Sequence, residues 1–193
     1  KSRSDTETLI NLYSKIRHSK IPKILNGMFA YVVFDKVKDN LIIVNDSQGE
    51  KNLYCYQDEN FFIISSNIKP IIKYIEKLKF NYITLNNYFK TRHFMPLDNT
   101  CFKKVHLLKN SSNNIFNLSK KFYFQKKYDD PKNWISRIEY SKYKNMPEKK
   151  VISIFEKALL DQAKLMIPPI NFGCIVSGGI DSTLQARLVN RFK

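Results

Sequence analysis

The chain of 193 residues has few of the residues on which disulfide-rich proteins and metal centres depend. It contains three cysteines, Cys55, Cys101 and Cys174, which lie far apart. Their spacing matches no zinc site, and an odd, scattered set argues against a disulfide framework. Free cysteines of this kind are typical of a reducing compartment, so we expect a cytoplasmic protein.

Long hydrophobic runs are also missing. No apolar stretch approaches the roughly 20 residues that a membrane-spanning helix needs, and no secretory signal pattern is present near residue 1. We therefore expect no membrane partner. Hydrophobic residues nevertheless make up 43% of the chain and aromatic residues 13%, which is enough for a packed core.

Acidic residues are scarce relative to basic ones: 17 Asp and Glu stand against 33 Lys and Arg, for a net charge of +16. Such an excess can indicate nucleic-acid binding. However, most of the basic residues are lysines spread over the whole chain, and arginine, the better reader of bases and phosphates, is rare. We therefore expect no nucleic-acid partner, and a basic nucleic-acid-binding module is kept only as a less favoured alternative.

Glycine occurs only five times, yet two glycines are adjacent in the most informative stretch, residues 173–182. The apolar run 172–176 predicts a buried parallel strand, Ser177-Gly178-Gly179 predicts a turn, and the residues from Ile180 onward follow helical spacing. A glycine turn before a helix directs backbone N–H groups at one point, which favours a phosphate. The stretch lacks the lysine of a Walker loop and the spacing of a dinucleotide fingerprint. A plain connection between strand and helix is the alternative.

The residues before this stretch indicate an antiparallel α+β fold. Ser4 and Glu7 have the spacing of a capping box before a helix that should extend to about residue 18. Aromatic and β-branched runs separated by polar turns then predict neighbouring antiparallel strands. The expected strands are 28–34 with 41–44, 53–56 with 61–65, and a hairpin of 99–108 with 115–124; the expected helices begin near residue 69 and at Thr84, the latter covering 84–93.

The last third of the chain changes character. Residues 128–146 are polar and read as a linker, and Pro147 begins a long helix that ends before Pro168-Pro169. The phosphate-loop strand would then open a parallel α/β domain. Because the chain lacks an initial Met and such a domain needs further βα units, we expect an internal piece of a longer protein.

Four blocks, in this order, resemble the glutamine-dependent asparagine synthetases, and the resemblance spans nearly the whole chain. The blocks are Ser4–Glu7, Leu25–Tyr31, Asn45–Tyr54 and Ser177–Ser182. The chain departs from the family pattern at Asn45, where arginine is usual, at Asn52, where proline is usual, and at Asn67. The subgroup is therefore left open.

The resemblance implies that residues 1–127 are the C-terminal part of an N-terminal-nucleophile glutaminase domain. The nucleophile of that family is a cysteine at the first position of the mature chain, so we assign no catalytic residue within these 193. Asp5 matches the aspartate that holds the α-ammonium group of glutamine. From spacing alone, a helix-start role for Asp5 is the favoured alternative. Asn26-Gly27 matches a strand start, and not the oxyanion hole of the family.

By the same resemblance, residues 128–146 are a linker and residues 147–193 begin a synthetase domain of the ATP pyrophosphatase type. The cofactors implied are ATP and Mg²⁺. Ser177, Gly178, Gly179 and Ser182 would hold the departing pyrophosphate. Asp181 would reach Mg²⁺ or, alternatively, cap the helix, and Val176 would make a backbone contact near the adenosine.

The function implied is ATP-dependent amidation of aspartate through an acyl adenylate, with ammonia taken from glutamine. The small-molecule partners would be glutamine, aspartate and ATP. A related amidotransferase, or a ligase of the β-lactam synthetase type with another carboxylate acceptor, is the alternative, because the acceptor pocket lies outside these residues. We expect the 193 residues alone to be inactive, and a homodimer of the full-length protein is left open.

Overall fold

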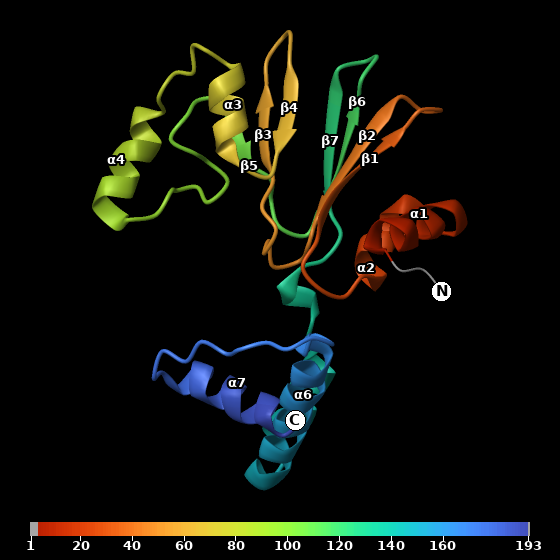
Figure 1. The fold of residues 1–193 in the computed structure, drawn as a ribbon, viewed down its shortest axis with the longest axis vertical. Coiled ribbons are helices and arrows are strands. Elements are labelled where there is room, and N and C mark those ends of the chain that lie inside the picture. Colours follow the sequence, from red (N-terminus) through yellow and green to blue (C-terminus); the bar gives the residue numbers. More distant parts are fainter. Residues whose placement is uncertain (1–3, 193) are drawn as a thin grey trace. The chain divides into compact units, whose positions relative to one another are not determined.

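The computed structural model describes residues 4–192, and the chain divides into two compact units, Lys1–Trp134 and Ile135–Lys193. Figure 1 shows strands in the first unit and helices joined by loops in the second. Among residues 4–192, no helix combines the length and the apolar character needed to cross a lipid bilayer. The boundaries expected from the sequence, 1–127, 128–146 and 147–193, stay predictions.

The first unit is built around two antiparallel sheets. The larger sheet has the order β1-β2-β6-β7, formed by Ala30–Asp35, Asn40–Asn45, Ser112–Asn117 and Phe122–Lys127. The smaller sheet has the order β4-β3-β5, formed by Phe62–Ser65, Tyr54–Gln57 and Val105–Leu107. The aromatic and β-branched runs of the sequence supply most of these strands, as expected for side chains that pack well on a pleated surface.

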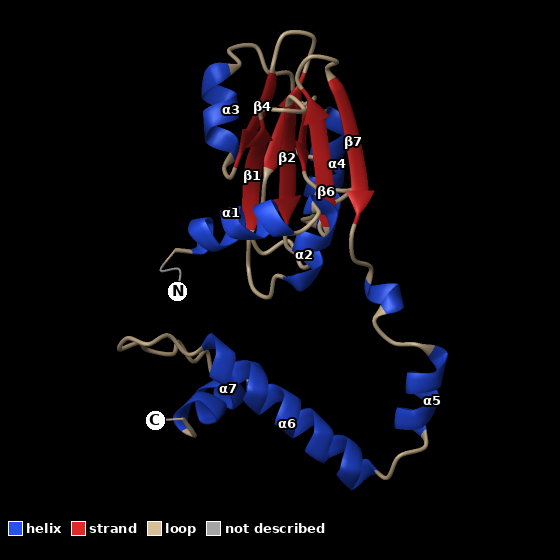
Figure 2. Cartoon of the chain, turned by 90° about the vertical axis from the view of Figure 1, so that its right-hand side faces the viewer, coloured by secondary structure: helices blue, strands red, loops and turns tan. Residues whose placement is uncertain are grey.

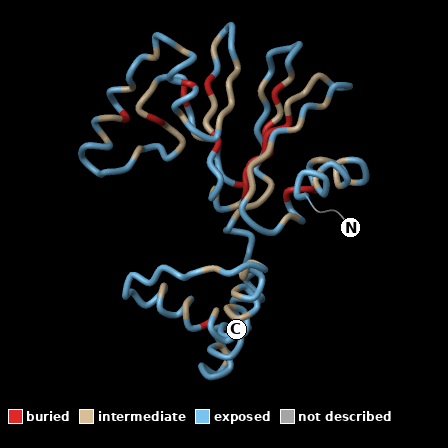
Figure 3. The backbone as a smooth tube through the Cα atoms, in the orientation of Figure 1, coloured by how far each residue is buried: buried red, intermediate tan, exposed pale blue. Residues whose placement is uncertain are grey.

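The two sheets pack against each other through side chains that face inward at alternate positions along each strand. Ile43 and Phe116 of the larger sheet meet Leu53 and Leu108, and all four are nearly or fully buried. The rings of Phe62 and Phe116 stack with centroids 3.8 Å apart. Figure 3 shows the buried segments concentrated in the strands and at their ends.

Helices flank both sheets (Figures 1 and 2). Helices α1 (Asp5–Lys15) and α2 (Ile21–Ile24), joined by the 3₁₀ turn η1 (His18–Lys20), lie beside the larger sheet. Helices α3 (Ile68–Tyr74) and α4 (Tyr82–Thr91) lie on the side of the smaller sheet. A second core of Tyr56, Ile71 and Val105 joins α3 to that sheet. The antiparallel α+β fold expected for this part of the chain is confirmed.

The local predictions for this unit are correct only in part. Ser4 is the N-cap residue of α1, as expected, but its side chain makes no cap hydrogen bond; its carbonyl accepts from the backbone N–H and hydroxyl of Thr8, both at 3.1 Å. Helix α4 is capped by Asn81, whose side chain accepts from the N–H of Thr84, and Thr84 is itself buried inside the helix.

The expected hairpin of residues 99–108 with 115–124 does not form. Strand β5 pairs with β3 in the smaller sheet, whereas β6 lies between β2 and β7 in the larger sheet. A segment next to a polar turn can pair with a distant strand when its apolar face fits there better.

The second unit consists of helices and loops. It contains α5 (Arg137–Lys144), α6 (Glu148–Met166) and α7 (Ile180–Asn190). Helix α5 lies within the stretch expected to be a linker. It begins with a capping box, in which the side chains of Ser136 and Glu139 each accept a hydrogen bond from the other residue's backbone N–H. Arg191 and Glu156 form an ion pair at 2.9 Å that ties the end of α7 to α6.

The strand expected at residues 172–176 is not formed, and no strand occurs among residues 135–192. A parallel strand is stable only when neighbouring strands pair with its backbone and helices cover both of its faces. Ile175, in the middle of the segment, is 97% exposed. A parallel ATP pyrophosphatase domain is therefore not observed in this part of the chain.

Candidate functional site

One buried carboxylate organises the loop that follows β2. Asp46 is 2% exposed. Its two carboxylate oxygens accept from four backbone N–H groups, those of Gln48, Glu50, Lys51 and Phe29, at 3.0–3.3 Å. Its own N–H donates to the carbonyl of Phe29 at 2.8 Å. Asp46 therefore holds loop 46–51 against the residues that lead into β1.

A groove of about 820 Å³ lies next to this loop, at the N-terminal end of α1. Asp5 lines it from α1, Asn26 and Gly27 from the segment before β1, and Glu50 and Lys51 from the loop that Asp46 holds. The groove thus combines two carboxylates with one ammonium group. Gly27 has φ +129°, a backbone conformation that favours glycine. Asn26-Gly27 precedes β1 by a few residues and also lines this groove.

A buried polar network joins three strands of the larger sheet. Asn114 is fully buried; its amide donates to the Ile43 carbonyl at 3.2 Å and to the Ser112 hydroxyl at 2.8 Å. Its carbonyl oxygen accepts from the Tyr123 hydroxyl at 2.6 Å and from Gln125 at 2.9 Å. Satisfied buried networks of this kind rigidify the backbone that they join.

Asn45 extends the network to the end of β2. It is 1% exposed, its side-chain oxygen accepts from the Ser112 hydroxyl at 3.3 Å, and its carbonyl accepts from the Tyr128 hydroxyl at 2.8 Å. The arginine that is usual here in the family would bring a charge into a site closed to water, which is costly unless paired. The neutral amide of Asn45 fits the buried position.

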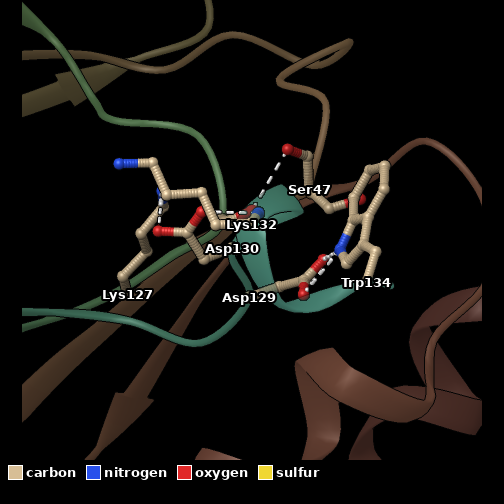
Figure 4. A network of polar contacts seen from close by, with 7 residues as sticks. Ser47, Lys127, Asp129, Asp130, Lys132 and Trp134 are labelled. Atoms are coloured by element: carbon tan, nitrogen blue, oxygen red, sulfur yellow. Dashed lines mark hydrogen bonds and ion pairs between the residues drawn. The ribbon is translucent and has the colours of Figure 1, made fainter. Parts of the chain in front are cut away.

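In the segment after β7, the carboxylates of two aspartates accept hydrogen bonds from neighbouring residues (Figure 4). Asp130 accepts from the Lys132 N–H and from the Lys127 ammonium, both at 3.0 Å, and these bonds hold the pKa of its carboxyl below the usual value. The indole N–H of Trp134 donates to Asp129 at 2.9 Å. The first unit therefore ends in an ordered turn.

The predicted phosphate loop, in the second unit, has the geometry of a turn into a helix. Gly178 has φ +85°, and Gly179 is the N-cap residue of α7. The hydroxyls of Ser177 and Ser182 lie 3.1 Å apart, and the Ser182 hydroxyl also accepts from the Ser177 N–H at 3.3 Å. The sequence thus brings Ser177, Gly178, Gly179 and Ser182 together, with Val176 and Asp181 directly before and after the turn.

The turn leads into the N-terminus of α7. The first backbone N–H groups of a helix have no partner within the helix, and the helix dipole makes that end positive. A Cβ atom built on Gly178 meets nothing within 4 Å, so the outer side of the turn is open. The N-cap residue of α7 is Gly179, so the alternative of Asp181 as the cap is wrong, and Asp181 lies in the first turn of the helix. No group of three or more His, Cys, Asp or Glu side chains within residues 4–192 could hold a metal ion by itself.

Two of the three cysteines are poor nucleophiles. Burial raises the pKa of Cys55 to about 12 and also raises the pKa of Cys101. A thiol becomes a nucleophile when it ionises, so burial of this kind makes it inert. Cys174 is exposed, but it lies in the second unit, shortly before the predicted phosphate loop.

Comparison with known families covers the first unit. Residues 1–129 match the family described as glutamine amidotransferase domain. The chain belongs to this family. The match covers more than half of the chain, and it includes Asp5, the Asp46 loop and the whole of the larger sheet. The resemblance stated from the sequence is confirmed at this level.

The amidotransferase chain is also similar to a protein of Methanocaldococcus jannaschii named putative asparagine synthetase (glutamine-hydrolyzing) 2. The two are 32% identical over 198 residues, which cover 98% of this chain and 36% of the relative. This chain therefore spans about a third of the length of the relative. Because 98% is covered, the similarity continues beyond the amidotransferase domain into the second unit.

Sequence reasoning missed the residue that organises the groove. Asp46 lies within the block 45–54, and its position in the sequence gives a usable signal. An aspartate before a short polar segment with glycine commonly accepts from backbone N–H groups two or more residues later. Its burial, and that of Asn45 and Asn114, could not be read from polar residue types, which are usually exposed.

Proposed function

We propose that this chain is part of a glutamine-dependent asparagine synthetase: the later part of its glutaminase domain and the start of its ATP-binding domain. The observation that carries the proposal is the similarity to a protein of that name over 98% of the chain. Asp5 lines the groove of the first unit, and the glycine turn in the second unit presents a helix N-terminus. The chemistry of each fits a different half of the reaction.

The groove of the first unit suits an α-amino acid. A free amino acid carries an ammonium and a carboxylate on one carbon, and the groove offers Asp5 and Glu50 to the first and Lys51 to the second. Asp5 would pair with the α-ammonium of glutamine in a charge-assisted bond. The attacking thiolate would come from a cysteine elsewhere in the full-length protein. It would attack the side-chain amide carbon and release ammonia.

The loop of the second unit suits a departing pyrophosphate. In the proposed reaction, the side-chain carboxylate of the substrate aspartate attacks the α-phosphorus of ATP. The bond between the α-phosphorus and the bridging oxygen of the β-phosphate breaks, and pyrophosphate leaves. The first backbone N–H groups of α7, from Ile180 to Ser182, and the hydroxyls of Ser177 and Ser182 would stabilise its growing charge. Bound Mg²⁺ would neutralise phosphate oxygens, with Asp181 as the ligand from this chain. Ammonia then attacks the acyl carbon, and AMP leaves.

The test uses the full-length protein and two nitrogen donors. Asparagine and AMP are measured with ATP and aspartate, using glutamine in one series and ammonium chloride in the other. We expect Asp5→Asn to lower kcat/KM for glutamine about 10- to 100-fold, the equivalent of one lost charge-assisted hydrogen bond. The ammonium-dependent rate should be unchanged. Glu59→Gln, an exposed charge outside the groove, should leave both series unchanged.

Two results would contradict the proposal. If Asp5→Asn lowers both series equally, Asp5 acts through folding and has no role in glutamine binding. If AMP forms only with a carboxylate other than aspartate, the protein is a related ligase with a different acceptor.

A further inference from the structure

Asn26 and Gly27 form the only Asn-Gly pair in the sequence, and they lie in the segment between α2 and β1. Asparagine is one of the chemically labile residues of proteins. Its side-chain carbonyl carbon can be attacked by the backbone nitrogen of the next residue, and glycine, which has no side chain, obstructs this approach least. In a folded protein, the reaction requires that both atoms are free to meet.

The two reacting groups are free in the structure. Asn26 and Gly27 are both exposed. Within residues 4–192, neither the Asn26 side chain nor the Gly27 N–H has a hydrogen-bond partner. A Cβ atom built on Gly27 meets nothing within 4 Å. The backbone around the pair therefore has room for the ring that such an attack closes.

A second asparagine before a small residue shows the opposite situation. Ser111 follows Asn110, but Ser111 is 1% exposed and its N–H donates to the Asp46 carbonyl at 3.1 Å. The Asn110 amide donates to the Gln48 carbonyl at 2.7 Å. Both groups that would react are thus held by hydrogen bonds, and reaction there would first have to break them.

We propose that Asn26 is a site of spontaneous deamidation in the folded protein. The Gly27 nitrogen loses its proton and attacks Cγ of Asn26. The new N–C bond closes a succinimide ring, the bond between Cγ and Nδ2 breaks, and the amide nitrogen leaves as ammonia after it takes up a proton. Water then opens the ring at either carbonyl carbon, which leaves aspartate or isoaspartate at position 26.

The product adds a carboxylate to the groove that Asp5 lines. Asn26 lines this groove, and the charged residues among its described lining residues are Asp5, Glu50 and Lys51. Their formal charge is −1, from two carboxylates and one ammonium group, and deamidation makes it −2. Lys51 is the one cation among these residues, so the new carboxylate competes for it with the carboxylate of a bound amino acid.

The first test follows the modification itself in the full-length protein. Samples are kept at pH 7 and pH 9, in native buffer and in urea, and tryptic peptides are analysed by mass spectrometry. Enzymatic methylation identifies isoaspartate. We expect Asn26 to be modified in native buffer, faster at pH 9 because the attacking nitrogen must lose a proton. Asn110 should be modified only in urea.

Two controls make this test decisive. Asn26→Gln keeps the amide but would have to close a larger ring, so the peptide that contains position 26 should stay unmodified. Asn110 reports whether the native fold persists during the incubation. The proposal is overturned if Asn26 reacts much more slowly in native buffer than in urea, or if Asn26 and Asn110 react equally fast in the native protein.

The second test concerns the groove, and it rests on the proposed function. Asn26→Asp should raise KM for glutamine about two- to fivefold, as for competition between exposed charges, and leave the ammonium-dependent rate unchanged. Asn86→Asp, at an exposed position of α4 outside the groove, should change neither. An unchanged KM in Asn26→Asp overturns the effect on the groove. If the unmodified protein does not use glutamine, the proposed function fails, and the mass spectra still decide the modification.

Discussion

At the scale of single residues, two buried polar side chains hold loop 46–51 and the strands of the larger sheet in place. The carboxylate of Asp46 accepts charge-assisted hydrogen bonds from four backbone N–H groups. Asn114 joins β2, β6 and β7 through four hydrogen bonds of its side chain. Such residues are valuable only while every partner is in place, because an unsatisfied buried group costs more than a satisfied one gains.

Replacement of Asp46 by alanine should therefore destabilise the first unit. The change leaves four backbone N–H groups near the groove without their acceptor, so we expect the free energy of unfolding to fall by about 3 kcal/mol or more. Urea denaturation followed by circular dichroism measures the change. Glu59→Gln, at an exposed position, should stay within about 0.5 kcal/mol of the unmodified chain. A similar small effect for Asp46→Ala would show that the loop does not depend on this carboxylate.

Cysteine reactivity gives a prediction with a defined pH dependence. Because burial raises the pKa of Cys55 to about 12, only about one thiol in 10⁴ is ionised at pH 8. Iodoacetamide at pH 8 should therefore modify the exposed Cys174 first, and Cys55 only after unfolding, as measured by mass spectrometry of peptides. Equal modification rates in the native chain would contradict the burial of Cys55.

The raised pKa of Cys55 also makes the free energy of unfolding depend on pH. The folded pKa of Cys55 is higher than that of an unfolded thiol, about 8.5. Its contribution to stability is fully present below that value and is lost as the pH rises toward 12.

At the scale of single elements, the stability of a short helix depends on the hydrogen bonds at its ends. Helix α5 has no buried residue, so packing contributes little to its stability, and the reciprocal bonds between Ser136 and Glu139 carry more weight than in a packed helix. The backbone N–H and hydroxyl of Ser136 both donate to Glu139 and hold the pKa of its carboxyl below the usual value. This contribution is present above the unfolded pKa of Glu139 and is lost as the pH falls.

Loss of the Ser136 cap should be visible in hydrogen exchange. Ser136→Ala removes an N-cap worth about 1 kcal/mol, so the amides of α5 should exchange about fivefold faster. Ser141→Ala, inside the same helix, replaces serine with the best helix former and should slow exchange slightly or leave it unchanged. An unchanged rate in Ser136→Ala would mean that the capping box does not stabilise α5 in solution.

At the scale of the whole molecule, the two units differ in how much hydrophobic surface they bury. The first contains two hydrophobic clusters between and beside its sheets. Among the described residues of the second, only Leu188 is a buried hydrophobic residue, and Phe155 and Leu165 of α6 are 62% and 68% exposed. Local opening is easiest where few apolar contacts oppose it.

Limited proteolysis of the 193-residue chain should therefore cut the second unit first. We expect trypsin to cleave at lysines within residues 135–192 while a fragment close to residues 1–134 survives, as measured by the masses of the products. In urea, where both units are unfolded, cleavage should be equally fast in both. Survival of residues 135–192 for as long as the first unit in native buffer would contradict the difference in stability.

The sequence alone determined the elements that depend on near neighbours. The runs at 30–35 and 40–45 and those at 54–57 and 62–65 pair across short turns, so little chain entropy opposes their contact, and these strand pairs were predicted correctly. The glycine turn and the helix after it were also correctly placed, because residues with φ > 0 and helical spacing leave a local signal.

Only the tertiary structure decided the long-range choices. Residues 105–107 and 112–117 lie close in sequence but enter different sheets, because each pairs where its apolar face meets the core. The same choices buried the polar residues Asp46, Asn45 and Asn114, whose hydrogen-bond partners lie up to 83 positions away along the chain. Residues 172–176 show the reverse case: an apolar run has strand character, but a strand exists only when another strand supplies the partners for its backbone.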